Sequence, residues 1–379
     1  MANPYIHSSL NITQKLEVLS RDSQYDLACA CATASDEHRY RSIDNRWIYP
    51  VSFAFGKKTF LFKTLLSNFC RNNCKYCPLR QNQDIKRLSL VPYELAKTFL
   101  EYFRQGKVSG VFLSSGVFEK PDQVMSRINQ SAEIVRRSGF RGYIHLKIIP
   151  GSSQAAIRHS LSLATTVSLN IEFPGEEYFK SLAPDKNYHK DIFETIAYIS
   201  RLRMEFEPAK RPHQTTQFVI GAAKETDRQI INQTSLLYNR YKLNRVYFSA
   251  YQRGQDDRNI HGESFKASNA ELLTREHRLY QVDWLLRKYG FKVEEIPLED
   301  DGNLSLVYDP KEIWAKRNPD FFPVNVNKAD RLSLLRVPGL GAISIECILM
   351  LRRQKKIQSL DVLGPAGKRL KKALNYVCF

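Results

Sequence analysis

The segment Phe60-Leu-Phe-Lys-Thr-Leu-Leu-Ser-Asn-Phe-Cys70-Arg-Asn-Asn-Cys74-Lys-Tyr-Cys77 joins a short apolar run to three closely spaced cysteines. The aromatic and aliphatic side chains at residues 59–66 predict a β-strand. In a parallel α/β sheet, functional residues gather where the strands end. We therefore expect Cys70, Cys74 and Cys77, spaced C-x3-C-x2-C, to lie at the functional edge of a sheet.

Strand-like and helix-like segments alternate downstream of this run as far as residue 289. Short apolar or β-branched runs predict five further strands, at residues 110–113, 142–148, 166–171, 215–220 and 245–250. Helical periodicity and start signals predict helices at residues 93–105, 122–138, 192–203, 227–241 and 269–289. Such alternation implies parallel strands with right-handed crossovers. The predicted fold class is α/β, a partial (β/α)6 TIM-like barrel with a small all-α C-terminal domain.

Three thiolates at this spacing suit one face of a [4Fe–4S] cluster. Electron-transfer clusters usually take four cysteines, so one iron here is left for a ligand that is not protein. The alternatives are a zinc site or three buried thiols. Structural zinc needs four ligands in tetrahedral geometry, and the nearby sequence offers neither a paired CxxC nor a close histidine. The pattern therefore predicts that Cys70, Cys74 and Cys77 are the metal ligands of a [4Fe–4S] cluster.

An aromatic residue, Tyr76, precedes the last cysteine, and the whole motif resembles that of the radical S-adenosylmethionine (SAM) enzymes. The resemblance covers residues 58–289 and agrees with the predicted six-unit barrel. It implies two cofactors, the [4Fe–4S] cluster and SAM, whose reductive cleavage gives a 5'-deoxyadenosyl radical. It also implies a reductant such as flavodoxin or ferredoxin.

The same resemblance implies SAM contacts where the later strands end. Many members have Gly-Gly-Glu after the second strand, whereas this chain has Ser114-Ser115-Gly116 and lacks the acidic residue. On the third predicted strand, His145 and Lys147 share one face, and a lysine there favours anion binding. The expected cofactor-binding residues are Tyr76, Ser114, Ser115, Asn170, Glu172, Gln217, Ser249 and Tyr251. The alternative is that these polar residues only begin loops, and no catalytic residue is assigned.

The C-terminal sequence predicts two helices joined by a tight turn at Pro338-Gly339-Leu340-Gly341. This pattern resembles a helix-hairpin-helix motif, which grips nucleic-acid phosphates through backbone N–H groups. A second, degenerate copy ends at Lys368 and Arg369. The residues expected to bind nucleic acid are Pro338, Gly339, Leu340, Gly341, Lys368 and Arg369. The alternative is an ordinary helical hairpin with a solvated basic face.

Charge supports a polyanionic partner, because 57 Lys and Arg face 39 Asp and Glu, for a net charge of +18. The expected organisation is an N-terminal extension (1–57), a partial barrel (58–296), a Pro-rich linker (297–323) and a nucleic-acid-binding module (324–379). Neither a signal peptide nor an apolar run of membrane-span length is evident, so we expect a cytoplasmic protein with no membrane partner. The remaining cysteines, Cys29, Cys31, Cys347 and Cys378, are expected to be packing residues.

Sequence blocks along nearly the whole chain, such as Leu182-Ala-Pro-Asp-Lys186 and Arg317-Asn-Pro-Asp-Phe-Phe-Pro323, resemble one bacterial family, the putative DNA modification/repair radical SAM proteins. That resemblance implies a uracil-DNA-glycosylase-like partner, but no assigned reaction. Our leading hypothesis is a radical SAM enzyme that modifies or repairs DNA bases. The alternatives are an RNA-modifying radical SAM enzyme and a non-catalytic Fe–S protein that binds nucleic acid or senses redox state.

Overall fold

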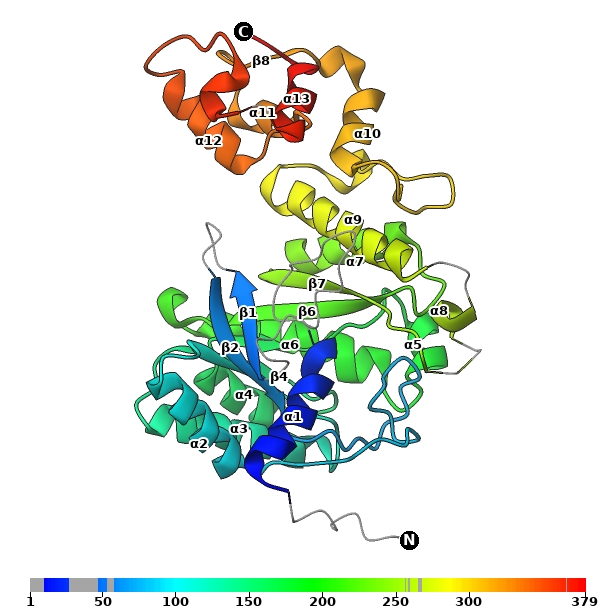
Figure 1. The fold of residues 1–379 in the computed structure, drawn as a ribbon. Coiled ribbons are helices and arrows are strands. Elements are labelled where there is room, and N and C mark those ends of the chain that lie inside the picture. The colour runs from blue at the N-terminus through cyan, green and yellow to red at the C-terminus, as the bar shows by residue number, and fades with distance from the viewer. Residues whose placement is uncertain are drawn as a thin grey trace. The chain divides into compact units, whose positions relative to one another are not determined.

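Seven strands form one sheet whose spatial order follows their order in the chain (Figure 1). β1 pairs antiparallel with β2, and every later pair is parallel. The strands are β1 (Ile48–Ser52), β2 (Lys58–Leu65), β3 (Gly110–Ser114), β4 (Tyr143–Lys147), β5 (Thr166–Ser168), β6 (His213–Ile220) and β7 (Arg245–Ala250). This computed structural model describes residues 10–26, 47–52, 58–255, 257, 260–264, 268–365 and 367–379, so Cys29 and Cys31 lie outside the described residues.

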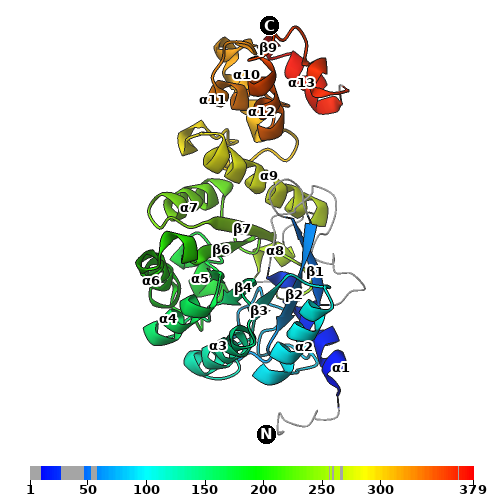
Figure 2. The same cartoon turned by 90° about the vertical axis from the view of Figure 1, so that its left-hand side faces the viewer.

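Helices cover the outer face of the sheet, and Figure 2 shows α2, α3, α4 and α6 side by side along it. Pro92 and Pro121 occupy the first positions of α2 and α3, where a missing N–H costs nothing. The apolar faces of both helices are buried, for example at Phe99 and Ile128. The helices of this part are α1 (Ile12–Asp22), α2 (Pro92–Arg104), α3 (Pro121–Arg137), α4 (Gln154–Leu163), α5 (Glu176–Leu182), η4 (Tyr188–Phe193), α6 (Glu194–Leu202), α7 (Asp227–Asn239), α8 (His261–Ser264) and α9 (Asn269–Lys288).

The six predicted parallel strands are all present, which confirms the partial barrel. β5 is shorter than expected, because the chain leaves regular pairing after Ser168. β1 was not predicted, and it pairs with β2 as the first strand of the sheet. Pro50 obscured this strand in the sequence, although proline is tolerated in an edge strand. α1 also belongs to the barrel core, since Leu16 and Leu19 are buried.

The chain divides into two units, one of Met1–Glu225 with Leu236–Glu276 and the other of Thr226–Ser235 with His277–Phe379. The second unit has its own apolar core, which includes Leu334, Leu335 and Ile345. Its elements after α9 are η7 (Val293–Glu295), α10 (Pro310–Arg317), η8 (Pro319–Phe321), β8 (Val324–Asn325), α11 (Arg331–Arg336), α12 (Ala342–Leu351), η9 (Leu360–Leu363), α13 (Lys368–Leu374) and β9 (Val377–Cys378). Among the described residues, no helix is long and apolar enough to cross a membrane.

Two features of the second unit differ from the sequence prediction. The segment expected to be a linker, residues 297–323, is packed, because its prolines begin α10 and η8 and Trp314 is buried. The C-terminal module is also not all-α. β8 and β9 form a short parallel pair, in which Val324 is opposite Val377. This pair joins the two ends of the module, an arrangement that no local sequence pattern announces.

Candidate active site

The cysteine loop, residues 70–77, follows β2 directly at the carboxyl-terminal edge of the sheet. Cys74 is buried, and Cys70 and Cys77 are half-buried. The guanidinium of Arg87 donates hydrogen bonds of 2.6–3.1 Å to four carbonyl oxygens around the loop, those of Asn68, Leu79, Arg80 and Gln83. The backbone that presents the thiols is therefore held from one side by a single arginine.

Burial dominates the electrostatics of the thiols. It raises the pKa of Cys77, and the nearby charges of Cys74 and Cys70 raise it further. Burial raises the pKa of Cys74 too, although the ammonium of Lys186 opposes the shift by its charge and a hydrogen bond. Without a metal, Cys74 and Cys77 therefore hold their protons, and iron must displace these protons because the thiolate is the ligand.

Gly116 allows β3 to end against this loop. A Cβ at residue 116 would lie 2.1 Å from the backbone oxygen of Phe69, a distance no side chain tolerates. The Gly116 amide donates to the Ser67 oxygen at 2.7 Å. The hydroxyl of Ser115 donates to the Gly116 oxygen at 2.8 Å, so this predicted SAM ligand is engaged with its own backbone. The glycine is therefore required for the close approach of two backbone segments.

Several predicted cofactor residues meet around an N-terminal carboxylate. Ser114 Oγ donates to Asp26 Oδ2 at 2.6 Å, and Lys147 Nζ forms an ion pair with Asp26. The same ammonium donates to Asn170 Oδ1 at 2.6 Å. Gln217 Nε2 donates to the backbone oxygen of Tyr25 at 2.9 Å. Residues 25 and 26 thus lie at the carboxyl ends of β3, β4 and β6, a region that we call the barrel mouth.

Glu172 has an unusual backbone in addition to a buried carboxylate. Its φ is +61°, a left-handed conformation that glutamate rarely adopts. Two hydrogen bonds to β6 hold it there, from the Glu172 amide to the Gln217 oxygen at 3.0 Å and from the Val219 amide to the Glu172 oxygen at 2.8 Å. Burial raises the pKa of the Glu172 carboxyl, while Lys186 and Lys147 pull it down. Such imposed backbone strain is typical of functional positions.

The other predicted cofactor residues lie nearby but have separate partners. Ser249 is buried at the end of β7, and Tyr251 donates its hydroxyl to Glu263 Oε1 on α8 at 2.7 Å. Tyr76 packs edge-on against Phe173, with ring centroids 5.2 Å apart. None of these contacts tests whether the side chains bind SAM, and that assignment stays a prediction.

The sequence analysis missed two charged residues of this site, Asp26 and Lys186. Burial opposes ionisation of Asp26, but the charge of Lys147 and hydrogen bonds from Lys147 and Ser114 bring its pKa below the usual value. Asp26 was missed because it precedes the barrel by many residues. Lys186 lies in a block already noted for its family resemblance, and this was the available signal. His145, on the same face as Lys147, bonds through Nε2 to Ser168 Oγ at 2.9 Å.

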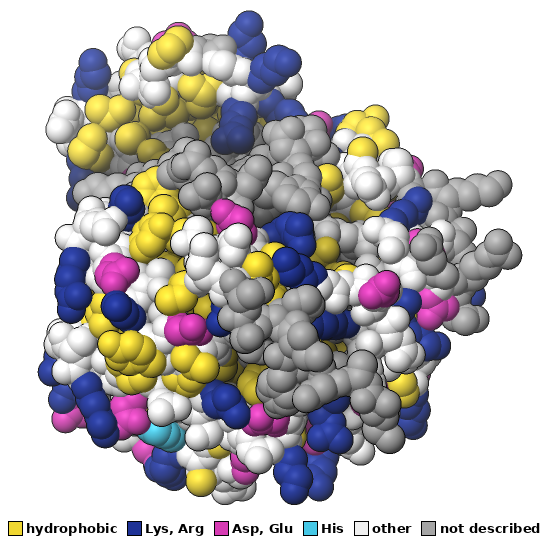
Figure 3. All heavy atoms as spheres, turned by 60° about the horizontal axis from the view of Figure 1, so that its bottom comes forward, with side chains coloured by type: hydrophobic (Ala, Val, Ile, Leu, Met, Phe, Trp, Pro, Cys, Tyr) yellow, Lys and Arg dark blue, Asp and Glu magenta, His cyan; other side chains and the backbone are white. Residues whose placement is uncertain are grey.

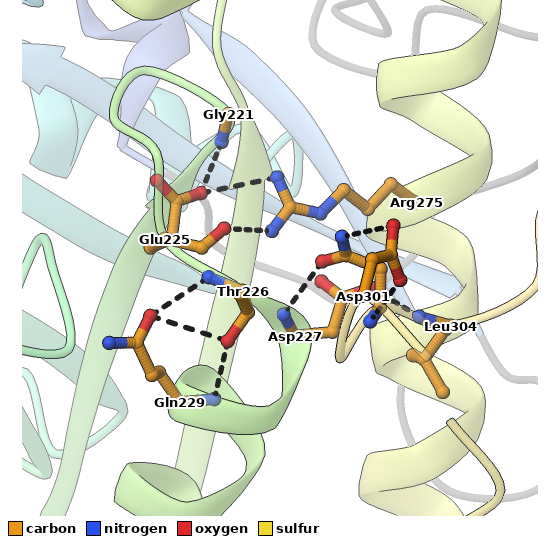
Figure 4. A network of polar contacts seen from close by, with 9 residues as sticks. Gly221, Glu225, Thr226, Asp227, Gln229, Arg275, Asp301 and Leu304 are labelled. Carbon is orange, nitrogen blue, oxygen red and sulfur yellow. Dashed lines mark hydrogen bonds and ion pairs between the residues drawn. The ribbon is translucent and has the colours of Figure 1, made fainter. Parts of the chain in front are cut away.

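The loop after β6 is fixed by a buried carboxylate, shown in Figure 4. Glu225 Oε1 accepts from the Gly221 amide at 2.7 Å and from Arg275 Nη1 at 3.3 Å. In the second unit, the Asp227 carboxylate accepts from the Leu304 amide at 2.9 Å, and Figure 4 also shows this contact. Both carboxylates are used to hold loops.

The C-terminal turn lies between α11 and α12, and its two glycines have different surroundings. Gly339 has φ +87°, and a Cβ there would lie 2.2 Å from the backbone oxygen of Arg369. The close neighbour of Gly339 is therefore the chain's own backbone, and its expected contact with nucleic acid stays a prediction. Gly341, at the N-cap of α12, has only Tyr289 Oη near its Cβ position, at 3.7 Å. Pro338 and Leu340 are buried, whereas Lys368 and Arg369 are exposed.

Comparison with known proteins defines the class of the barrel. Residues 64–232 match the family model of the Radical SAM superfamily. Residues 64–232 therefore carry a radical SAM domain, and the enzymes of this superfamily use a [4Fe–4S] cluster and SAM. Bound together, these cofactors supply an organic radical for chemistry at an unreactive carbon. No curated protein matches the chain significantly.

Solved structures of radical SAM enzymes resemble part of the chain. The FeFe-hydrogenase maturase HydG from Carboxydothermus hydrogenoformans is 17% identical, with 57% of this chain and 50% of that chain covered and a TM-score of 0.44. Methylornithine synthase (PylB) is 17% identical, with 59% of this chain and 63% of that chain covered and a TM-score of 0.42. Coproporphyrinogen III oxidase (HemN) from Escherichia coli is 13% identical, with 57% of this chain and 50% of that chain covered and a TM-score of 0.38. This chain thus spans about half the length of HydG and HemN, and no conclusion about its substrate follows.

The donors at the cysteine loop suit the cluster. Three thiols lie on one short loop, and none is in a disulfide. Within the described parts of the chain, no group of three or more Cys, His, Asp or Glu side chains is arranged to hold a metal ion. A cubane binds each cysteine to a different iron, so its ligands need not converge on one point. The cluster would be held by Cys70, Cys74 and Cys77. Lys186 interacts electrostatically with these three residues and with Glu172, and so connects the cysteine loop to the barrel mouth.

Proposed function

We propose that this chain is a radical SAM enzyme that acts on nucleic acid, with DNA as the substrate and base modification or repair as the reaction. The observation that carries the proposal is a strongly basic C-terminal module, residues 324–379, with an apolar core, in a chain that also carries a radical SAM domain. The module's core includes Leu334, Ile345 and Ala373.

In the part of the chain that the structure describes, most of the module's basic side chains are not in an ion pair with an acidic residue. The module has only three acidic residues, of which Glu346 pairs with Arg331 at 2.8 Å. The exposed basic residues are Lys328, Arg331, Arg353, Lys355, Lys356, Lys368, Arg369, Lys371 and Lys372. On the face shown in Figure 3, by comparison, Lys and Arg side chains are scattered among acidic and apolar ones. A dense basic surface favours phosphate binding driven by counterion release.

The turn before α12 gives this charge a backbone component. Because Gly341 has no side chain and open surroundings, a phosphate can approach the first-turn amides of α12, which have no partners within the helix. Such contacts position nucleic acid without identifying its sequence. A base inside a duplex is shielded from a radical, so the reacting base must be flipped out or single-stranded.

The test is fluorescence anisotropy of the full-length protein with duplex DNA, single-stranded DNA and RNA over a salt series. The double variant Lys368→Glu/Arg369→Glu should weaken DNA binding at least tenfold and reduce the salt slope by about 2. The matched control is Lys97→Glu/Arg104→Glu on α2, where both side chains are exposed. Equal loss of DNA affinity in both double variants would show that binding depends on net charge alone and not on the C-terminal module. Tighter binding of RNA than of DNA would favour the RNA-modifying alternative.

Activity separates the enzyme from a non-catalytic Fe–S protein. The reconstituted protein should cleave SAM under a strong reductant, and its product with DNA should be detectable by mass spectrometry of digested nucleosides. Flavodoxin or ferredoxin would serve as the reductant in the cytoplasm. The family resemblance further implies a uracil-DNA-glycosylase-like partner. The absence of SAM cleavage by a protein with a full cluster would contradict the enzyme proposal.

A further inference from the structure

The segment 182–186 is fastened to the cysteine loop by backbone and side-chain contacts. The Lys75 amide donates to the Leu182 oxygen at 2.8 Å. The Asn73 amide donates to Asp185 Oδ2 at 2.5 Å. Lys186 Nζ donates to the Tyr76 hydroxyl at 3.4 Å. Three residues of the loop, Asn73, Lys75 and Tyr76, are thus paired with this one segment, which places a lysine near the cysteines.

Lys186 is placed where its charge acts on the sulfurs. Burial lowers the pKa of Lys186, whereas the sulfurs of Cys74, Cys77 and Cys70, ionised as cluster ligands are, and the carboxylate of Glu172 raise it. Two arginines also lie beside the loop, but the guanidinium of Arg87 is occupied by the four carbonyl oxygens described above, and that of Arg80 donates to the oxygens of Lys75 and Gln255. Of these three cations, Lys186 is the one that donates to a side chain of the loop, that of Tyr76.

We propose that Lys186 is a positioning residue that raises the reduction potential of the [4Fe–4S] cluster. Reduction adds one negative charge to the cluster, and a fixed cation nearby stabilises the reduced form. Net charge and hydrogen bonds at the sulfurs are the main means by which proteins set cluster potentials. The inference depends on the cluster and not on the nucleic-acid substrate, so the two proposals fail separately.

The experiment is an EPR-monitored redox titration of the anaerobically reconstituted full-length protein without SAM. Lys186→Met should make the reduction potential of the cluster more negative by at least about 59 mV. For one electron, this shift is a tenfold change in the ratio of reduced to oxidised cluster at a given potential. Lys186→Arg should restore most of the wild-type potential. The control is Lys180→Met on α5, where the lysine is exposed and pairs with Glu176. This control should not move the potential.

A second uncharged variant, Lys186→Gln, guards against a packing defect in Lys186→Met. An unchanged potential in either uncharged variant with full iron and sulfide content would overturn the proposal. Loss of the cluster from both uncharged variants, with normal loading of Lys186→Arg, would assign the charge to cluster assembly and would also overturn it. An effect seen only after SAM is added would make Lys186 a SAM ligand instead of a tuning residue.

Discussion

The carboxylate of Asp26 and the ammonium of Lys147, which lie 121 residues apart in the chain, form an ion pair inside the barrel mouth. Only 18% of the Asp26 side chain and 12% of the Lys147 side chain are exposed. The pair connects the N-terminal segment to the ends of the strands that carry the predicted cofactor residues. Asp26, which precedes the barrel strands in the chain, is therefore part of the site.

Removing the charge of Asp26 should destabilise the protein. Asp26→Asn removes the ion-pair partner of Lys147 in a poorly solvated position, and we expect the free energy of unfolding to fall by about 2 kcal/mol, below the roughly 3–5 kcal/mol of fully buried pairs. Urea denaturation measures this loss. Glu133→Gln, which removes the exposed partner of Arg137, should cost less than about 0.5 kcal/mol. Equal effects of the two substitutions would show that the Asp26 pair is merely a surface contact.

The cluster should depend on each cysteine of the loop. Cys74→Ala should abolish the visible absorption and EPR signal of the reconstituted protein, because two thiolates do not retain the cluster. Cys347→Ala is the control, since Cys347 is a half-buried free cysteine of the second unit. Full iron content in the Cys74 variant would refute the ligand assignment.

The carboxylate of Glu172 should contribute to SAM binding. Glu172→Gln keeps the side chain's size and removes its charge, so SAM affinity should fall by about 1–3 kcal/mol while the cluster stays intact. Isothermal titration calorimetry under anaerobic conditions measures the dissociation constant. Glu176→Gln, at an exposed position on α5, is the control. Unchanged affinity for SAM in the Glu172 variant would remove this residue from the cofactor site.

His145 should make the protein less stable in mild acid. Burial, with help from Lys147, lowers its pKa to about 3, whereas an unfolded histidine titrates near about 6.5. Between these values the unfolded chain binds more protons, so the stability is fully present above about pH 6.5 and falls as pH drops. At pH 5.5 the contribution of His145 to the free energy of unfolding is about 1.4 kcal/mol smaller than at pH 7.5.

Urea denaturation of wild type and His145→Gln at pH 7.5 and pH 5.5 measures this effect. The difference in the free energy of unfolding between pH 7.5 and pH 5.5 should be about 1.4 kcal/mol smaller in the variant than in wild type. His159→Gln, at an exposed position, should behave like wild type. An identical pH dependence in wild type and the His145 variant would mean that His145 does not stay neutral in the native state.

The two glycines of the C-terminal turn should separate folding from binding. Gly339→Ala places a Cβ against the Arg369 oxygen at a positive φ, so stability should fall by at least about 2 kcal/mol. Gly341→Val has room and should cost less than about 1 kcal/mol, yet it should weaken DNA binding by blocking the α12 amides. Thermal unfolding and anisotropy, measured on both variants, test the contrast. Weak DNA binding that follows stability alone would identify the turn as structural.

Local patterns in the sequence were sufficient for much of the fold. Apolar runs predicted all six parallel strands, since strand formation follows from short-range hydrophobic patterning and β propensity. The spacing of Cys70, Cys74 and Cys77 indicated the cluster because all three ligands lie on one loop. Where a local rule was broken, as at Pro50 in β1, the prediction failed.

The charges around the cluster depend on contacts that no local pattern encodes. Asp26 meets Lys147, and Lys186 reaches the cysteine loop, only because the parallel strands bring their carboxyl ends to one edge. Likewise, the φ of Glu172 is imposed by hydrogen bonds from β6. The sequence by itself determined the parallel strands of the barrel and predicted three cysteines as the metal ligands. Strand order and register determined which distant charges meet, because the free energy of a buried ion pair depends on distances that exist only after folding.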